Sequence, residues 1–138
     1  MWQLKPAQAA DMPGIEELIA EVDGDRVDLV ADQFVVAKDE DGKILGCGRL
    51  RPYPEFCEIA SLAVAPDGRS KGLGREIVNS LLSRFQGPIY LICEYNVVEF
   101  FRRFDFVLLP VSDMPAGLRP KWDYFSAVEG TMNLMRRG

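Results

Sequence analysis

The stretch that decides the fold reads Leu62-Ala63-Val64-Ala65-Pro66-Asp67-Gly68-Arg69-Ser70-Lys71-Gly72-Leu73-Gly74. Residues 57–64 form a β-rich run that ends at a proline and a glycine, so a strand gives way to a turn there. Beyond the glycines, apolar residues recur at helical spacing at Ile77, Val78, Leu81, Leu82 and Phe85. The pattern predicts a strand, a glycine loop and a helix in succession.

The loop before this helix has the properties of an anion site. The first backbone N–H groups of a helix lack partners within it and lie at the positive end of its dipole. Gly72 and Gly74 have no Cβ, so a pyrophosphate can approach the main chain, and Arg69, Lys71 and Arg75 add positive charge. We therefore expect a diphosphate ligand here. The alternative is that the glycines serve only a turn and close helix packing.

Two familiar phosphate loops do not fit this stretch. The P-loop pattern Gly-x-x-x-x-Gly-Lys-Ser/Thr occurs nowhere in the chain. The dinucleotide pattern Gly-x-Gly-x-x-Gly would begin at Gly72, but Ile77 occupies the place of its third glycine. A P-loop nucleotidase is excluded, and a Rossmann cofactor site is not supported.

On the N-terminal side, residues 2–5 are expected to form a first strand. A helix follows with Asp11 as its N-cap, Pro13 near its start and apolar residues at helical spacing up to Gly24. Residues 23–32 fit either a further helical turn or a loop and stay unassigned. Residues 33–38 and 43–50 flank Asp41-Gly42, which predicts an antiparallel hairpin.

On the C-terminal side, residues 89–93 are continuously apolar, which indicates a central strand covered on both faces. A short helix over 97–103 and a strand over 106–109 follow. Prolines then punctuate what we expect to be a long loop, and residues 131–135 form a closing strand. The order of elements predicts a single α/β domain over residues 1–138, with a mixed sheet.

Composition narrows the function classes. The net charge of -5 disfavours nucleic-acid binding, and no apolar run reaches the roughly 18 residues needed to cross a bilayer. The N-terminus lacks secretory signal features, so we expect a cytoplasmic protein. No histidine is present, which excludes a histidine-based triad and the commonest zinc sites, and we expect no metal. Cys47, Cys57 and Cys93 have the character of reduced core thiols.

Residues 62–74 closely resemble the acetyl-coenzyme A motif of the GNAT superfamily of N-acetyltransferases, whose pattern is Gln/Arg-x-x-Gly-x-Gly/Ala. A second stretch, Glu99-Phe100-Phe101-Arg102-Arg103-Phe104-Asp105-Phe106, resembles the family's Phe-Tyr-Glu-Lys-Leu-Gly-Phe helix and strand. Within the superfamily, residues 100–104, 109–110 and 131–135 are similar to the acetyltransferase domain of N-acetylglutamate synthases. The resemblance implies a mostly antiparallel sheet flanked by helices, with a splay between the fourth and fifth strands.

The resemblance also implies a cofactor and its binding residues. Acetyl-CoA would be the acetyl donor, with its pantetheine arm entering the splay. Backbone amides of the fourth strand would hold the thioester carbonyl and stabilise the oxyanion. The implied cofactor-binding residues are Leu62, Ala63, Val64, Arg69, Ser70, Lys71, Gly72, Leu73, Gly74 and Arg75.

The acceptor amine must lose a proton before it attacks, and a carboxylate acting through water is one solution. Glu58 is the first candidate because strand alternation places it on the face of Leu62 and Val64. Glu94 is the rival. The alternative for Glu58 is a structural role as a strand-edge carboxylate, either in water or paired with a nearby arginine. The family's usual tyrosine acid is replaced by Phe101, so Tyr95 is the substitute candidate. Cys93 could act as a nucleophile, but a buried strand thiol explains it better.

The predicted function is thus N-acetyl transfer to a small amine or amino acid, with a protein amine as the less favoured acceptor. A noncatalytic acyl-CoA-binding or sensing domain is the second hypothesis, because Phe101 replaces the usual acid. A purely structural domain is the third. The acceptor, the acyl-chain length and the oligomeric state stay open, although the final strand could pair with a second subunit to give a homodimer.

Overall fold

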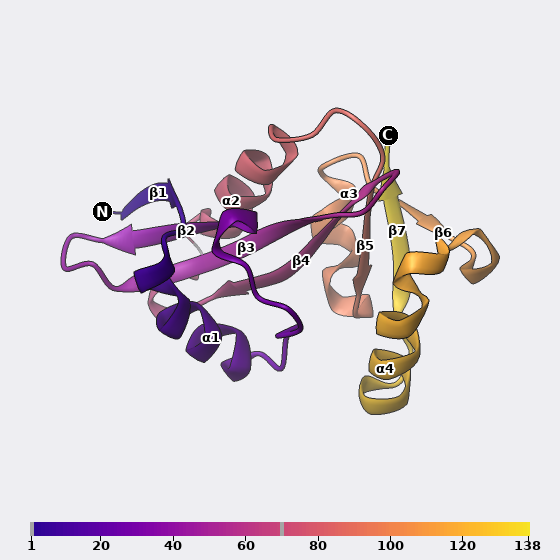
Figure 1. Ribbon diagram of the computed structural model, residues 1–138, viewed down its shortest axis with the longest axis horizontal. Coiled ribbons are helices and arrows are strands. Elements are labelled where there is room, and N and C mark those ends of the chain that lie inside the picture. The colour runs from indigo at the N-terminus through magenta and orange to yellow at the C-terminus, as the bar shows by residue number, and fades with distance from the viewer. Residues whose placement is uncertain (1, 70) are drawn as a thin grey trace. The chain divides into compact units, whose positions relative to one another are not determined.

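The computed structural model describes residues 2–69 and 71–138, and over these residues seven strands form one mixed sheet in the order β1-β2-β3-β4-β5-β7-β6 (Figure 1). The strands are β1 (Trp2–Pro6), β2 (Phe34–Asp39), β3 (Ile44–Pro52), β4 (Cys57–Val64), β5 (Ile89–Cys93), β6 (Val107–Leu109) and β7 (Asn133–Arg137). The helices are α1 (Met12–Glu21), α2 (Leu73–Leu82), α3 (Val98–Arg102) and α4 (Arg119–Glu129). None of the described helices has the length and apolar character of a membrane span.

The strand pairings are mostly antiparallel, as expected. β1 with β2, β2 with β3, β5 with β7 and β6 with β7 all run antiparallel. β4 and β5 run parallel, and their ladder joins Cys57 to Ile89 and Glu58 to Tyr90, at the beginnings of the two strands. The predicted fold class is confirmed.

The chain divides into two compact units. One comprises the described residues up to 51 and from 59 to 86, and the other comprises 52–58 and 87–138. The first unit contains the glycine loop, and the second contains Glu58 and Tyr95. That the whole chain acts as one acetyltransferase domain remains a prediction.

In the first unit, strand alternation sends residues of β2 and β3 toward different helices. Ile15 and Ile19 of α1 pack with Phe34 and Cys47 in one buried cluster. Gly46 is next to Cys47 in β3 and therefore faces the opposite side of the sheet. It leaves room for α2, because a Cβ at this position would lie 3.0 Å from Ile77 Cδ1. The two helices therefore cover opposite faces of this part of the sheet (Figure 1).

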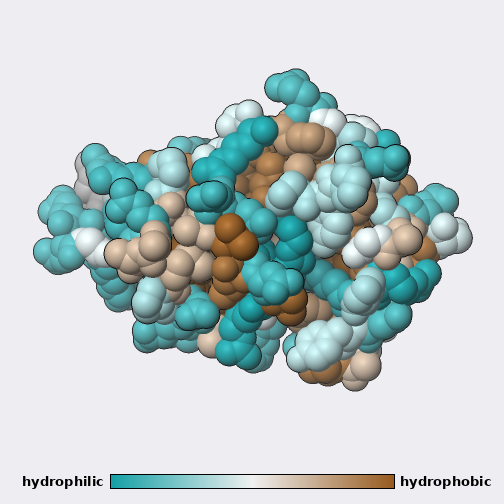
Figure 2. Space-filling view, viewed as in Figure 1, coloured by the Kyte–Doolittle hydropathy of each residue, from teal (hydrophilic) through white to brown (hydrophobic). Residues whose placement is uncertain are grey.

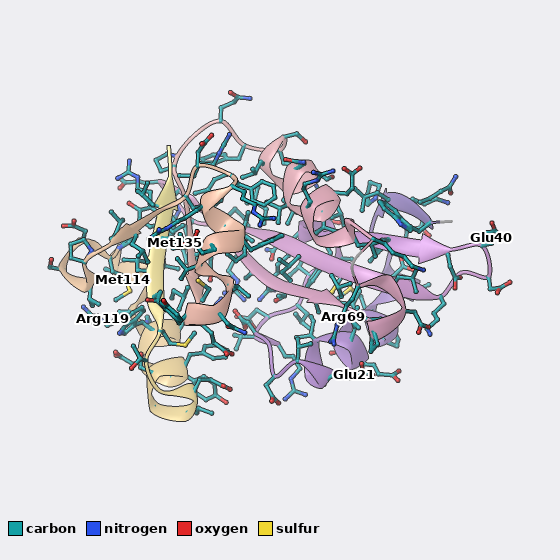
Figure 3. All side chains as sticks on the ribbon, turned by 180° about the vertical axis from the view of Figure 1, so that it is seen from behind. Glu21, Glu40, Arg69, Met114, Arg119 and Met135 are labelled. Carbon is teal, nitrogen blue, oxygen red and sulfur yellow. The ribbon has the colours of Figure 1, made fainter. Side chains whose placement is uncertain are left out.

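The hairpin between β2 and β3 turns where Asp41-Gly42 predicted it. Gly42 has φ +83°, a conformation that glycine adopts without strain, and Glu40 marks the tip of the turn in Figure 3. The Asp39 carboxylate accepts hydrogen bonds from the N–H groups of Asp41 and Lys43, both 2.9 Å long. Local side-chain bonds of this kind stabilise the turn.

Asp11 directly precedes α1, as predicted, but its carboxylate does not cap that helix. It accepts the Gln8 N–H at 2.8 Å and pairs with Lys38 Nζ of β2 at 2.6 Å. The capping prediction was wrong in this detail because a 3-10 turn, Ala9–Asp11, already precedes the helix. Burial by itself raises the pKa of the Asp11 carboxyl. Lys38 and the Gln8 N–H lower this pKa by more than burial raises it, so the pKa lies below its ordinary value.

Asp11→Asn is therefore expected to destabilise the protein by about 1 to 2 kcal/mol at neutral pH, because the charge-assisted hydrogen bonds are lost. A carboxyl with a lowered folded-state pKa stabilises the fold above its unfolded pKa of about 3.9, and this contribution disappears as pH falls through the folded pKa. Urea unfolding at a series of pH values measures both variants. Stability curves that stay parallel down to pH about 2 would contradict the assignment.

The second unit contains the main correction to the sequence prediction. Residues 110–130 are not one long loop, because α4 occupies Arg119–Glu129. Pro120 lies in the first turn of α4, where a missing N–H costs no hydrogen bond, so this proline starts a helix instead of preventing one. Trp122 thus lies on a helix and packs against a cluster that includes Leu118 and Leu134.

The closing strand β7 does not lie at the edge of the sheet, although it is the last strand of the chain. β7 pairs with β5 through Leu91↔Met135 and with β6 through Leu108↔Met135, so it lies between them. Prediction placed this strand over 131–135, two residues before its observed start and end at Asn133–Arg137. β6 follows Asp105, whose φ of +68° shows that this position uses the left-handed conformation for which the family has glycine.

The surface mixes polar and apolar residues. Hydrophilic residues cover much of the face shown in Figure 2 and surround smaller hydrophobic areas. Large apolar side chains are also exposed, among them Val27, Val107, Tyr124 and Val128. Scattered exposure of this kind is ordinary for a folded chain.

Candidate active site

The glycine loop forms the start of α2 without a capping side chain. Gly72 has φ +80° and ψ 11°, directly before the helix, and a Cβ at this position would meet nothing within 4 Å. The Glu76 N–H donates to the Gly72 carbonyl at 3.1 Å, which closes the first helical turn. The N–H groups of Leu73, Gly74 and Arg75 precede that bond, so helix geometry leaves them for water or a ligand.

Gly68 has a different role from Gly72. It is buried, and a Cβ would lie 2.9 Å from Leu73 Cδ2 and 3.2 Å from the Leu45 carbonyl oxygen. Leu73, the first residue of α2, is 1% exposed, so its buried side chain anchors the loop. The packing alternative for the glycines is therefore correct at Gly68, whereas Gly72 lies in open space.

Basic side chains surround this helix start. Arg69, Lys71 and Arg75 are exposed, and Arg69 Nε donates to the Val64 carbonyl oxygen at 3.3 Å (Figure 3). Ser70, also predicted to bind the cofactor, lies outside the described residues. Exposed N–H groups and positive charge at a helix N-terminus favour an anionic ligand.

β4 departs from regular alternation in its second half. Ser61 has φ +55°, its Oγ donates to the Asp25 carbonyl oxygen at 2.6 Å, and its own carbonyl oxygen lies 3.6 Å from Cys47 Sγ. Such a backbone interrupts the two-residue period, so alternation alone does not place Glu58 on the face of Leu62 and Val64. The two side chains after the interruption, Leu62 and Val64, are half-buried, and Ala63 between them is buried.

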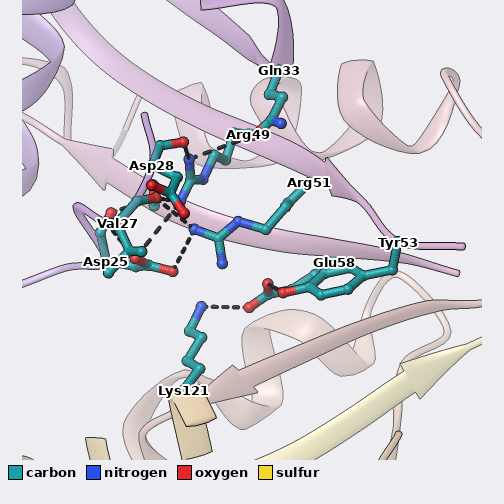
Figure 4. A network of polar contacts seen from close by, with 10 residues as sticks. Asp25, Val27, Asp28, Gln33, Arg49, Arg51, Tyr53, Glu58 and Lys121 are labelled. Atoms are coloured by element: carbon teal, nitrogen blue, oxygen red, sulfur yellow. Dashed lines mark hydrogen bonds and ion pairs between the residues drawn. The ribbon is translucent and has the colours of Figure 1, made fainter. Parts of the chain in front are cut away.

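Glu58 is fully buried and has two polar partners within its own unit. Tyr53 Oη donates to Oε1 at 3.0 Å, and Lys121 Nζ of α4 pairs with Oε2 at 2.5 Å (Figure 4). The Glu58 side chain is therefore not in water, whereas the other form of the structural alternative, a carboxylate paired with a nearby arginine, is not contradicted by its burial. Sequence reasoning missed Lys121 because it lies 63 residues from Glu58, in a segment taken for a loop.

The candidates after β5 lie in contrasting environments. Tyr95 is 83% exposed at the start of the turn Tyr95–Val97, and Glu94 is also exposed. Phe101, at the position of the family's tyrosine, is buried and makes edge-to-face contacts with Phe100 and Phe106. Phe101 is thus a core residue here, and Tyr95 remains the candidate that carries a hydroxyl.

The cysteines lie in the core. All three are buried and free, and Cys93 Sγ lies 3.9 Å from Met135 Sδ. Burial raises the pKa of Cys47 to about 12, and burial together with Glu94 raises the pKa of Cys93 to about 11. Thiols with such pKa values stay protonated at neutral pH, which agrees with the structural interpretation of Cys93. Among the described residues, no three His, Cys, Asp or Glu side chains gather where they could hold a metal ion.

A second buried charge cluster, also absent from the sequence predictions, lies in the first unit. The Asp25 carboxylate pairs with Arg51 Nη2 at 2.9 Å and lies 3.6 Å from Arg49 Nη2 (Figure 4). Arg49 also donates to the carbonyl oxygens of Val27 at 2.7 Å and Asp28 at 3.0 Å. These contacts hold the segment after α1, whose structure the sequence left unassigned, against β3.

The acetyltransferase motif implied a mixed sheet and a glycine turn that leads into a helix. The structure has both: β4 and β5 run parallel, and the turn at Gly72 starts α2. The Acetyltransferase (GNAT) family model matches residues 4–106, and the chain belongs to this family of acyltransferases.

Individual relatives agree with this assignment. An amino-acid acetyltransferase of Mannheimia succiniciproducens is 26% identical over 135 residues, which cover 88% of this chain and 30% of that protein. The chain therefore spans about a third of the length of the curated relatives it matches.

Solved structures share the fold. N-acetylglutamate synthase from Neisseria gonorrhoeae, complexed with coenzyme A and N-acetyl-glutamate, superposes with a TM-score of 0.81 at 18% identity, covering 99% of this chain and 35% of that one. Rv2747 from Mycobacterium tuberculosis, in complex with CoA, has a TM-score of 0.77 at 22% identity and covers 97% of both chains.

Proposed function

We propose that this chain, acting as one domain, transfers the acetyl group of acetyl-CoA to the primary amine of an amino acid. The observation that carries the proposal is the uncapped start of α2 behind Gly72, with its exposed basic side chains. Related proteins that bind coenzyme A, or are named amino-acid acetyltransferases, support both donor and acceptor class. A cytoplasmic location and a homodimer stay predictions.

In this proposal the donor binds along β4 and the glycine loop. The N–H groups of Leu73, Gly74 and Arg75 bind the pyrophosphate, with Arg69 and Lys71 adding charge. Ser70 keeps its predicted place in this set. The backbone at residues 62–64 holds the thioester carbonyl and stabilises the oxyanion during attack.

The reaction forms one bond and breaks one. The neutral amine attacks the thioester carbon, the new C–N bond replaces the C–S bond, and coenzyme A leaves as a thiolate. Glu58 accepts the amine proton through water, and Tyr95 or the solvent returns a proton to the thiolate. An ordinary thiol pKa of about 8.5 makes the thiolate a tolerable leaving group, so an acid is helpful but not essential.

Calorimetric titration with acetyl-CoA tests the donor site. Gly72→Glu is expected to weaken binding at least about tenfold, because it places a like charge at the pyrophosphate position. Gly42→Glu is the matched control: its φ of +83° is close to the +80° of Gly72, and its Cβ also meets nothing within 4 Å. Both variants suffer similar backbone strain, so only loss of binding in Gly72→Glu supports the proposal.

A binding domain without catalysis is the second candidate. The core position of Phe101 and the polar partners already contacting Glu58 favour it. The two functions are separated by incubating the protein with acetyl-CoA and each of the common amino acids and measuring the release of the coenzyme A thiol. Release with at least one amino acid supports the transferase, whereas binding of acetyl-CoA without release from any acceptor supports the binding domain.

A further inference from the structure

We propose that Ser61 is a positioning residue whose hydroxyl holds the left-handed backbone within β4 and so orients the backbone of residues 62–64 toward the thioester. The inference rests on the proposed function and adds to it a side chain that acts through the peptide groups after it. Its support is a hydrogen bond inside the first unit, in which Ser61 Oγ donates to the Asp25 carbonyl oxygen at 2.6 Å.

The backbone of Ser61 needs such support. Its φ of +55° lies in the left-handed region, where the Cβ of an L-residue is crowded by the main chain. A conformation of this kind persists only where the surrounding structure fixes it. Ser61 is 7% exposed, so water hardly competes for its hydroxyl, and its carbonyl oxygen lies 3.6 Å from Cys47 Sγ of β3. Contacts on both the side chain and the main chain therefore fix this residue.

The acceptor of the Ser61 hydrogen bond is itself held in place (Figure 4). Asp25 Oδ1 accepts the Val27 N–H at 2.9 Å, which stabilises a local turn. Arg49 of β3, whose side chain has no exposed surface, donates to the carbonyl oxygens of Val27 at 2.7 Å and Asp28 at 3.0 Å. The turn is thus anchored to β3. Because the acceptor is a backbone oxygen, the contact with Ser61 does not depend on the charge of the Asp25 side chain.

The backbone at Ser61 decides how the rest of β4 faces the sheet. Leu62 lies on the side of α2, since a Cβ on Gly48 would lie 3.3 Å from Leu62 Cδ1 and 2.9 Å from Ile77 Cγ2. Ala63 belongs to the buried cluster that contains residues of α1. Rotation about the Ser61 backbone would turn the peptide groups that follow it. The proposed oxyanion donors are among those groups, and their stabilising effect depends on their direction.

Two substitutions separate the hydroxyl from the backbone conformation. Ser61→Ala removes the hydroxyl but keeps the Cβ, so the left-handed conformation loses its support and stays strained. Ser61→Gly also removes the hydroxyl, but glycine adopts this conformation without strain. Ser83→Ala is the matched control, because Ser83 Oγ also donates to a backbone carbonyl oxygen at 2.6 Å, but from the exposed end of α2. The folding of each variant is checked by circular dichroism.

Ser61→Ala is expected to lower kcat for amine acetylation about tenfold to a hundredfold, because the oxyanion donors turn away from the thioester. Ser61→Gly should keep kcat within about threefold of the native value, because the left-handed backbone remains accessible to it. Ser83→Ala should leave kcat unchanged. Native kcat in Ser61→Ala would overturn the proposal. An equal loss in Ser61→Gly and Ser61→Ala would also overturn it, because the conformation would then not be what the hydroxyl provides.

A nuclear magnetic resonance measurement keeps the test independent of turnover. A positive φ brings the Hα of a residue close to its own N–H proton. The nuclear Overhauser effect between these two protons of residue 61 should therefore be strong in the native chain and weak in Ser61→Ala. A strong effect in both proteins contradicts the proposed role.

The same spectra compare the complexes with acetyl-CoA and with coenzyme A, which differ only in the acetyl group. In the native chain the N–H signals of residues 62–64 should differ between the two complexes, and in Ser61→Ala this difference should be lost. If no acceptor is acetylated but both spectral changes occur, the proposed transfer fails and the role of Ser61 stands. Native signals that do not respond to the acetyl group, or an equal response in Ser61→Ala, contradict that role.

Discussion

Glu58→Gln is expected to lower kcat for amine acetylation by about 10² to 10⁴, the usual contribution of a general base. Glutamine keeps the size of the side chain and can still accept a hydrogen bond from Tyr53 Oη, but it cannot take a proton. KM for acetyl-CoA should stay within about twofold, because the proposed donor contacts belong to the backbone at residues 62–64 and to the glycine loop. Steady-state kinetics with the best acceptor measure both quantities.

Glu94→Gln is the comparison for this experiment, since Glu94 was the rival base. Its side chain is exposed after β5, and its substitution should leave kcat nearly unchanged. A large loss in Glu94→Gln together with a small loss in Glu58→Gln would exchange the two roles. Because Glu58→Gln also breaks the ion pair with Lys121, the folded state of the variant is checked by thermal unfolding before its kinetics are interpreted.

Asp25→Asn is expected to lower the free energy of unfolding by about 3 to 5 kcal/mol, the cost of removing one partner from a buried ion pair. The Arg49 side chain has no exposed surface, and Arg49 Nε already has no acceptor among the described residues. Loss of the Asp25 charge would leave the buried guanidinium of Arg49 without its carboxylate. The Asp25 carboxylate also accepts the Val27 N–H at 2.9 Å, so the turn after α1 loses order as well.

Urea unfolding followed by circular dichroism measures this loss. Asp67→Asn is the control, because it breaks an ion pair of 2.8 Å with Lys43 in which both side chains are well exposed. Exposed pairs contribute little, so no measurable change is expected there. Equal stability of the Asp25→Asn and native proteins would show that this cluster does not stabilise the fold.

Local patterns in the sequence were sufficient for most of the fold. The bounds of β4 and β5 were predicted to the residue, because each is a short β-rich run beside a strong turn signal, Pro66-Asp67-Gly68 after β4 and Gly87-Pro88 before β5. The glycine loop was also predicted, since helix-start chemistry depends on neighbouring residues alone. The helix α4 was missed because three prolines suggested a loop, although a proline in the first turn of a helix is compatible with it.

The sequence by itself therefore determined the order of most elements, the family resemblance and the glycine turn that precedes α2. All of these depend on residues close together along the chain. Only the tertiary structure decided which charges are buried together: Lys121 with Glu58, and Asp25 with Arg49. The physical reason is that a buried charge needs a partner in space, and folding brings that partner from 63 residues away in one case and from a different element in the other.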